Sequence, residues 1–361
     1  MTGPGTAATG VRGPAPPDLA MRPVVVAWEV TRACALRCLH CRADAQPHRA
    51  AGELDAADGM GLVDDLARFG PVTLILTGGD PMLRPDLVDI ARRATDRGLR
   101  VALTPSATGK VTPARLEALR AAGVEQLAIS LDGSGPADHD AMRGVRGSFA
   151  RSLRILGWAR EAGFTLQVNT TLTRHNVHHI PQMAANAVAA GAAMWSVFFL
   201  VPTGRGRSTD MLDAEGQERA LRTLVGMRAR LPLRLKVTAA PAVRRVEQQM
   251  AEEGLVPPTP APWPVNDARG FMFISHDGEV CPSGFLPVSA GNVRSASAVD
   301  LYRDAPLFRN LRDPGLLMGR CGVCRWRDVC GGSRARAFAL TGDLHADEPT
   351  CPYVPEMEPA C

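Results

Sequence analysis

Residues 34–41, with the sequence CALRCLHC, place Cys34, Cys38 and Cys41 within eight positions. The apolar run Pro23–Val30 before them is typical of a buried β-strand, so the cysteines are expected on the loop that follows it. Thiolates are the ligands of iron–sulfur clusters, and three of them can hold three irons of a [4Fe-4S] cubane. The fourth iron would lack a protein ligand, and an open metal position is typical of a catalytic site.

Two other interpretations of this triplet are less favoured. Three cysteines are one ligand short of a closed structural zinc site, although His40 or His48 could complete it. Buried cysteines that bind no metal rarely cluster so tightly on one loop. The ligand count and the position after a strand therefore favour an iron–sulfur cluster over zinc.

Short apolar runs alternate with helical patterns over residues 23–201. Each run is nearly continuous, as expected of parallel strands that are buried on both faces. Six strand–helix units with right-handed crossovers give either an open doubly wound sheet or a partial barrel, and periodicity does not decide between them. The expected strands are Pro23–Val30, Val72–Thr77, Arg100–Thr104, Gln126–Leu131, Thr165–Leu172 and Met194–Val201.

The triplet, with His40 at the position before the third cysteine, resembles the cluster motif of the radical S-adenosylmethionine (SAM) family. In that family three cysteines hold a [4Fe-4S] cluster whose unique iron chelates the amino and carboxylate groups of SAM. Reductive cleavage of SAM gives a 5′-deoxyadenosyl radical that abstracts hydrogen from the substrate. The resemblance implies an α/β fold, a partial (β/α)6 barrel over roughly residues 23–201.

The second expected strand ends in TGGDP, residues 77–81. Glycines remove side chains where the backbone must approach a ligand, and a carboxylate beside them can receive an ammonium group. Alone, such a run is more often a turn. One strand–helix unit after the triplet, it resembles the family's GGE-type motif, which implies that Gly78, Gly79 and Asp80 hold the SAM amino group.

Polar residues at later strand ends are, by the same resemblance, the expected contacts of the SAM carboxylate and ribose. Ser, Asp and Asn also dominate ordinary turns, so for Asp132 a turn role is an equal alternative. Arg143 could pair with a carboxylate or be a solvated loop charge. The expected contacts are Ser106, Ser130, Asp132 and Asn169.

A second group of cysteines near the C-terminus has the spacing C-x2-C-x5-C-x20-C. Four thiolates provide a complete ligand set for either a [4Fe-4S] cluster or a zinc ion. The spacing alone favours neither of the two. The run resembles the auxiliary-cluster module of the SPASM/twitch radical SAM subgroup, especially enzymes that trim tetrapyrroles in haem and haem d1 synthesis. This resemblance implies a second [4Fe-4S] cluster on Cys321, Cys324, Cys330 and Cys351.

The module departs from the complete SPASM pattern of seven cysteines. Arg334 stands where one of the missing cysteines would be, so a single auxiliary cluster is expected. Cys281 is then a remnant, either a free thiol or a distant substrate contact, and Cys361 is incidental. Arg334 and Arg336 are interpreted as solvated charges near the cluster in preference to substrate contacts.

Composition argues against several classes of partner. Lys and Arg number 41 against 37 Asp and Glu, with no long block of one sign, so neither nucleic acid nor a membrane surface is an expected partner. No run of 18 apolar residues predicts a transmembrane helix, and the N-terminus lacks the apolar segment of a secretory signal. We therefore expect a cytoplasmic location.

Four segments are expected along the chain. Residues 1–20 form a disordered leader rich in Gly, Pro and Ala, and residues 21–205 form the core barrel. Residues 206–264 form a helical connector that ends in a proline-rich linker, and residues 265–361 form the cysteine-rich module. The run TGRGR, residues 203–207, is expected to be a flexible turn beside a substrate pocket that no motif identifies.

The sequence thus predicts a radical SAM enzyme that uses SAM and two [4Fe-4S] clusters. Its expected substrate carries a carboxylate and is either tetrapyrrole-like or a ribosomal peptide, and its expected partner is an electron donor such as flavodoxin or ferredoxin. The alternative from another class is a non-catalytic iron–sulfur or zinc protein that senses redox state. Such a sensor needs no SAM pocket, so the glycine pair and the polar strand ends favour the enzyme.

Overall fold

A computed structural model of the chain describes residues 18–258 and 265–355. Most of the expected leader, part of the proline-rich linker and Cys361 lie outside these residues.

The described residues form one curled sheet whose strand order is β7-β6-β5-β4-β3-β2-β1-β8-β9. From β7 to β1 the order follows the chain without the reversal that defines a doubly wound sheet, so the fold is the curled half-barrel. All neighbouring strands are parallel except β8 and β9. The strands are β1 Val25–Glu29, β2 Thr73–Thr77, β3 Arg100–Leu103, β4 Val124–Ser130, β5 Thr165–Leu172, β6 Met194–Phe199, β7 Arg234–Thr238, β8 Phe271–Ile274 and β9 Val280–Cys281.

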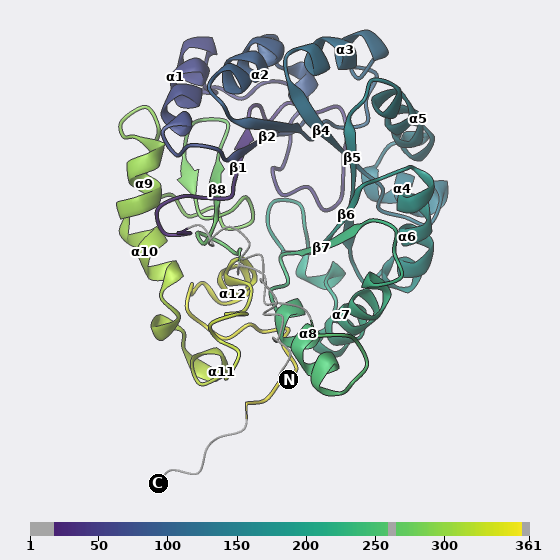
Figure 1. Cartoon of the computed structure of the whole chain (residues 1–361), viewed down its shortest axis with the longest axis vertical. Coiled ribbons are helices and arrows are strands. Elements are labelled where there is room, and N and C mark those ends of the chain that lie inside the picture. Colours follow the sequence, from purple (N-terminus) through teal and green to yellow (C-terminus); the bar gives the residue numbers. More distant parts are fainter. Residues whose placement is uncertain (1–17, 259–264, 356–361) are drawn as a thin grey trace, which may run out of the picture.

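Helices cover the outer face of the curled sheet, and the C-terminal part of the chain closes its open side (Figure 1). The sequence fits the first of these helices at its start, because Asp55 and Asp58 exchange side-chain and backbone hydrogen bonds in a capping box. The helices are α1 Ala56–Ala67, α2 Leu87–Asp96, α3 Pro113–Ala121, α4 Pro136–Arg143, α5 Ser148–Glu161, α6 Ile180–Ala189, α7 Ala214–Arg228, α8 Val243–Glu252, α9 Ala298–Asp304, α10 Pro306–Arg312, α11 Gly319–Gly322 and α12 Arg334–Thr341.

The core lies between the sheet and these outer helices. Trp28 of β1 and Trp195 of β6 are fully buried in it, and the indole N–H of Trp195 donates to Thr170 Oγ1 at 2.9 Å. Apolar residues fill the face of the central strands that packs against the helices, whereas the other face is mixed: Leu166, Val168 and Leu172 of β5 belong to the core, and Gln167, Asn169 and Thr171 are half-buried on the opposite face. The expectation of strands buried on both faces is therefore wrong for β5. This rigid sheet carries the loops at its carboxyl edge, where the predicted site residues lie.

The sheet continues across the expected boundary at residue 264. Strand β8 pairs in parallel with β1, with Val25 opposite Phe271, and β9 returns from it as the second arm of a hairpin. The cysteine-rich segment therefore begins on a strand of the core sheet. The division into a core and a C-terminal module stays a prediction.

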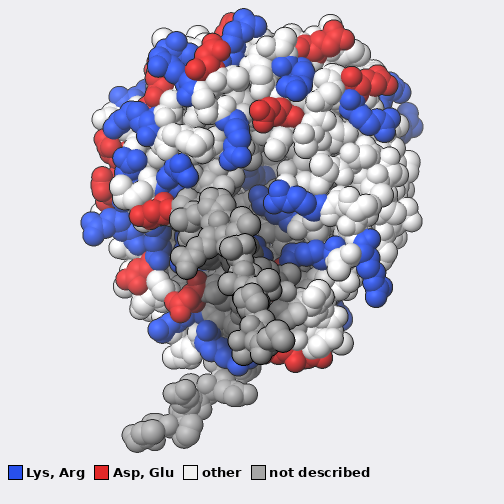
Figure 2. Space-filling model, in the orientation of Figure 1, with Lys and Arg blue, Asp and Glu red and all other residues white. Residues whose placement is uncertain are grey.

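The charged side chains on one face of the molecule are mixed in sign. On the face shown in Figure 2, Lys and Arg alternate with Asp and Glu around the rim. In the part of the chain that the structure describes, no helix combines the length and the apolar character needed to cross a membrane.

Candidate functional site: the cysteine loop and the carboxyl edge of the sheet

One cavity joins the cysteine triplet to the carboxyl ends of the strands. Cys34 and Cys38 are buried, and Cys41 is half-buried. Three loops that follow different strands thus meet at one place, which is the edge where parallel α/β sheets bind their ligands. Of the predicted site residues, those that line this cavity are Cys34, Cys38, His40, Cys41, Gly78, Gly79, Ser106, Ser130 and Asn169.

The geometry of the donors suits a cluster better than a single ion. Among the residues that the structure describes, no three His, Cys, Asp or Glu side chains lie close enough together to bind one ion. A tetrahedral zinc site needs its ligands within about 2.0–2.3 Å of one point. A cubane holds each cysteine on a different iron and so spaces the thiolates more widely. The three thiols around one cavity therefore fit an iron–sulfur cluster.

The glycine pair packs directly against the cysteine loop. The Gly79 N–H donates to the Thr31 carbonyl at 2.8 Å, and the Asp80 N–H donates to the Ala33 carbonyl at 2.7 Å. A Cβ on Gly79 would lie 2.4 Å from the Ala33 oxygen, and one on Gly78 would lie 2.4 Å from the Thr31 oxygen. The glycines are thus required by the approach of two protein loops, whereas the sequence suggested only the approach of a ligand.

Asp132 is fully buried and forms an ion pair with Arg143. Its Oδ1 accepts a hydrogen bond from Thr171 N at 2.7 Å, while Arg143 also donates to Cys38 Sγ at 3.6 Å. Burial raises the pKa of Asp132, but Arg143 and the neighbouring histidines outweigh it and leave the pKa lowered. Asp132 does not line the cavity, so in this geometry it holds Arg143 against the cysteine loop. The solvated alternative for Arg143 is wrong, because its guanidinium is buried.

Two histidines beside this pair are neutral at pH 7. Burial lowers the pKa of His40 to about 4, and burial likewise lowers that of His139 to about 4. His40 Nε2 lies 3.7 Å from Asp132 Oδ2, and His139 Nδ1 accepts from Asp132 N at 3.0 Å. In the described part of the chain, every charged side chain that lines the cavity is therefore an arginine, and these are Arg42, Arg143 and Arg205.

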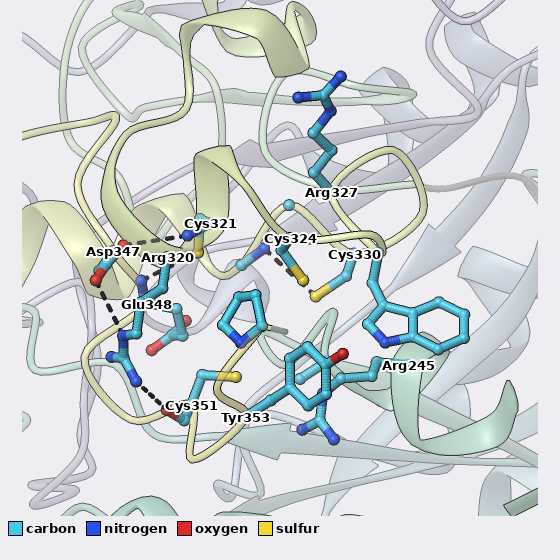
Figure 3. A pocket seen from close by; sticks show the side chains of 15 residues that line it. Arg245, Arg320, Cys321, Cys324, Arg327, Cys330, Asp347, Glu348, Cys351 and Tyr353 are labelled. Carbon is cyan, nitrogen blue, oxygen red and sulfur yellow. Dashed lines mark hydrogen bonds and ion pairs between the residues drawn. The ribbon is translucent and has the colours of Figure 1, made fainter. Parts of the chain in front are cut away.

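The four C-terminal cysteines line a second cavity. Figure 3 shows their sulfur atoms turned toward the same space, while Arg327 points away from it. Backbone N–H groups of Glu348 and Gly332 donate to Cys321 Sγ at 3.4 Å and to Cys330 Sγ at 3.5 Å. Burial raises the pKa of Cys330 to about 12, so a metal must displace protons from these thiols when it binds. The cysteines are Cys321, Cys324, Cys330 and Cys351.

A family model described as "Radical SAM superfamily" matches residues 28–187. The chain is also 39% identical over 346 residues to the "AdoMet-dependent heme synthase" of Nitratidesulfovibrio vulgaris, which covers 93% of this chain and 94% of that protein. The chain belongs to the radical SAM superfamily. It is therefore an enzyme of a family that uses SAM and a [4Fe-4S] cluster.

Two further matches show how wide this superfamily is. The "PqqA peptide cyclase" of Rhodopseudomonas palustris is 30% identical over 348 residues, covering 92% of this chain and 88% of that protein. A crystal structure of Streptococcus suis SuiB bound to the precursor peptide SuiA superposes with a TM-score of 0.71, over 92% of this chain and 76% of that one. At 15% identity this second likeness shows the fold alone.

Asp80 of the radical SAM enzyme faces away from the cavity. Its Oδ2 accepts from Thr108 Oγ1 at 2.7 Å, and its Oδ1 accepts from Met82 N at 3.1 Å. The carboxylate is fully buried, and burial raises its pKa. In this arrangement Asp80 braces the glycine loop, and it would have to release Thr108 to reach a ligand. That it receives the SAM ammonium stays a prediction.

We expect Asp80→Asn to weaken SAM binding by about 1.5–3 kcal/mol, because it removes a charge-assisted hydrogen bond to the ammonium. The measurement is the SAM dissociation constant of the reconstituted protein, whose iron content should not change. Thr108→Val is the matched control, since it removes the bracing hydrogen bond and keeps the carboxylate. If the two variants weaken SAM binding equally, Asp80 only braces the loop.

Arg205 is a site residue that the sequence did not identify. Its Nε donates to the Cys38 carbonyl at 2.9 Å, and its Nη1 donates to the Ala45 carbonyl at 2.9 Å. The preceding Gly204 has a φ of +63°, and a Cβ there would lie 2.4 Å from the Cys41 carbonyl oxygen. The expected turn over 203–207 is present, but it is anchored rather than flexible, because this segment clamps the cysteine loop. The only signal of this clamp in the sequence was the two glycines, Gly204 and Gly206, on either side of Arg205.

Two interpretations of the C-terminal segment need correction, and for Cys281 the structure favours the free thiol over a substrate contact. Arg334 and Arg336 are buried, not solvated: Arg334 donates to the Ala346 carbonyl at 2.7 Å, and Arg336 pairs with Glu348 at 3.2 Å. Cys281 is buried in β9 among apolar side chains, and burial raises its pKa to about 12. It is therefore a core thiol rather than a substrate contact.

Proposed function

We propose that this radical SAM enzyme removes CO2 from carboxylate side chains of an iron tetrapyrrole and so belongs to haem synthesis. The observation that carries the proposal is the set of guanidinium groups at the cavity: Arg42, Arg143 and Arg205 line it, while their carboxylate partners Glu29, Asp132 and Asp44 do not. An anionic substrate gains most from such a lining, because arginine binds carboxylates with paired hydrogen bonds. The "AdoMet-dependent heme synthase" that matches over 93% of the chain supports the same substrate class.

The proposed holders of the cofactors are the residues already described. Cys34, Cys38 and Cys41 would bind the first [4Fe-4S] cluster, and the four C-terminal cysteines would bind a second. When bound, the reduced first cluster and SAM supply a 5′-deoxyadenosyl radical that abstracts hydrogen from the substrate. Proposed contacts of SAM are His40, Gly78, Gly79, Ser106, Ser130 and Asn169, which line the cavity, and Asp80 once it releases Thr108. Asp132 does not line the cavity and positions Arg143 instead.

This chain's own residues prepare the cavity for that chemistry. Arg205 and the Asp132–Arg143 pair fix the cysteine loop from two sides, and Ser106 Oγ bridges Gly79 O at 2.7 Å to Cys34 Sγ at 3.4 Å. Such fixed supports keep the reacting groups in register, which a radical reaction needs in order to avoid side reactions. Flavodoxin or ferredoxin as electron donor, and a cytoplasmic location, stay predictions.

We expect the anaerobically reconstituted protein to convert iron coproporphyrin with SAM and dithionite. Abstraction of one hydrogen from a propionate side chain, followed by loss of CO2 and transfer of one electron to the proposed second cluster, would leave a vinyl group. The measurement is 5′-deoxyadenosine together with the mass and Soret spectrum of the macrocycle. Formation of 5′-deoxyadenosine with an unchanged macrocycle would contradict the tetrapyrrole as substrate and favour a peptide substrate instead. Absence of 5′-deoxyadenosine with every reductant would contradict SAM cleavage itself.

A further inference from the structure

Two phenylalanines line the cavity together with the polar strand ends. Phe198 belongs to β6, and Phe285 lies in the segment that follows β9, 87 positions later in the chain. Their ring centroids are 6.2 Å apart and their planes are tilted by 55°. Both side chains are half-buried, so part of each aromatic face is free to contact a ligand. Large apolar rings that stay partly uncovered in a cavity with mixed apolar and arginine lining mark a place for an apolar part of a ligand.

The backbone fixes Phe285 in this position. Thr203 Oγ1 donates to the Phe285 carbonyl at 3.1 Å, which ties the segment to the loop that carries Arg205. A Cβ on the neighbouring Gly284 would lie 2.9 Å from Arg42 Nε. The backbone at Gly284, which precedes Phe285, therefore lies close to the guanidinium of Arg42, and both Phe285 and Arg42 line the cavity.

Arg42 is held by a hydrogen bond at one edge of its guanidinium, which leaves its other N–H groups available to bind a ligand. Its Nη1 donates to Glu29 Oε2 at 2.9 Å, and its Cζ lies 4.4 Å above the centroid of the Phe273 ring. Glu29 is itself fixed by His276 Nδ1 at 2.9 Å. No other hydrogen bond of Arg42 is formed with the described residues, although the guanidinium carries five N–H donors and lines the cavity.

We infer that Phe198, Phe285 and Arg42 form the substrate subsite, which takes a flat macrocycle with carboxylate side chains. The two phenyl rings would contact the face of the macrocycle, and Arg42 would bind one carboxylate in the bidentate geometry that guanidinium groups favour. This inference rests on the proposed function, because it assumes a tetrapyrrole substrate. The subsite shares this cavity with the residues proposed for SAM, and Arg42 directly follows Cys41 in the cysteine loop.

The test is a titration of the reconstituted protein with iron coproporphyrin, followed through the Soret band. We expect Phe285→Ala and Phe198→Ala each to raise the dissociation constant about tenfold, the size of effect that loss of one aromatic contact produces. Phe285→Leu keeps the volume without the aromatic ring and should fall between Phe285→Ala and the parent. Phe271→Ala is the matched control, since Phe271 is half-buried in β8 and does not line the cavity.

Each outcome separates this inference from the proposed function. If the parent protein does not bind iron coproporphyrin, the proposed substrate is wrong. If the parent binds it and Phe285→Ala and Phe198→Ala bind it equally well, the proposed substrate is supported and the proposed subsite is wrong. If the variants keep their iron and lose affinity for SAM instead, the rings hold the adenine of SAM, and the inference is also overturned.

Discussion

Replacing Cys34, Cys38 and Cys41 together by alanine is expected to remove about half of the bound iron and all SAM cleavage. The three thiols line one cavity with the glycine pair, and their loss leaves the first cluster without protein ligands. Loss of the open iron position removes the site at which SAM is cleaved in this superfamily. The measurements are iron per chain after anaerobic reconstitution, about eight in the parent and four in the variant, and 5′-deoxyadenosine formed with dithionite.

Cys281→Ala is the control for this experiment. Cys281 is equally buried, but it packs against Ala27 and Phe273 in the core rather than lining either cysteine cavity. Its replacement should leave both the iron content and SAM cleavage at the parental level. Cleavage that survives in the triple variant would remove the first cluster from this loop, and stoichiometric zinc in the parent would contradict the second cluster.

The features predicted from the sequence are those that neighbouring residues determine. Cys34, Cys38 and Cys41 lie within one short loop, and their spacing is suited to three ligands of one cluster. This site could therefore be predicted without a structure. The strands were predicted from short runs rich in apolar and β-branched residues, and strand β5 has the predicted bounds Thr165–Leu172. These runs did not separate a half-barrel from a doubly wound sheet, and the correct choice followed from the resemblance of the cysteine triplet to the radical SAM motif.

The residues that were missed or misjudged act through contacts between distant parts of the chain. Arg205 binds the Cys38 carbonyl across 167 positions, and Arg336 binds the Leu200 carbonyl across 136 positions. Charged residues are usually exposed, so the sequence alone assigns an arginine to the surface. Only the folded structure shows which arginines have enough carbonyl and carboxylate partners to be buried.

Arg336 and Glu348 connect the C-terminal cysteine site to the barrel. Arg336 donates to the carbonyl groups of Leu200, at the end of β6, and Ala239, after β7. Glu348 accepts from Arg336 Nη1 and from Ser333 N at 2.7 Å, while its own N–H donates to Cys321 Sγ. Both side chains are at least 96% buried. Through these hydrogen bonds the pair links Cys321, a proposed cluster ligand, to Leu200, which lines the first cavity.

Glu348→Ala is expected to destabilise the protein by about 3–5 kcal/mol, because it leaves the Arg336 charge buried without its partner. Glu348→Gln keeps a hydrogen-bond acceptor for Ser333 and should cost less. The measurement is urea unfolding of the anaerobically reconstituted protein, together with the iron that each variant retains on desalting. Because metal binding and folding are coupled in a small module, we expect the alanine variant to lose iron from the C-terminal site first.

The exposed pair Arg325–Glu252 provides the comparison, since it joins the same module to helix α8 with both side chains more than half exposed. Solvent screens such a pair, so Glu252→Ala should hardly change the unfolding midpoint or the iron content. Burial, and not the presence of an ion pair between module and barrel, is thus the cause of the expected difference. If Glu348→Ala and Glu252→Ala have the same small effect, the Arg336–Glu348 pair does not hold the cysteine site against the barrel, and the two cavities are mechanically independent.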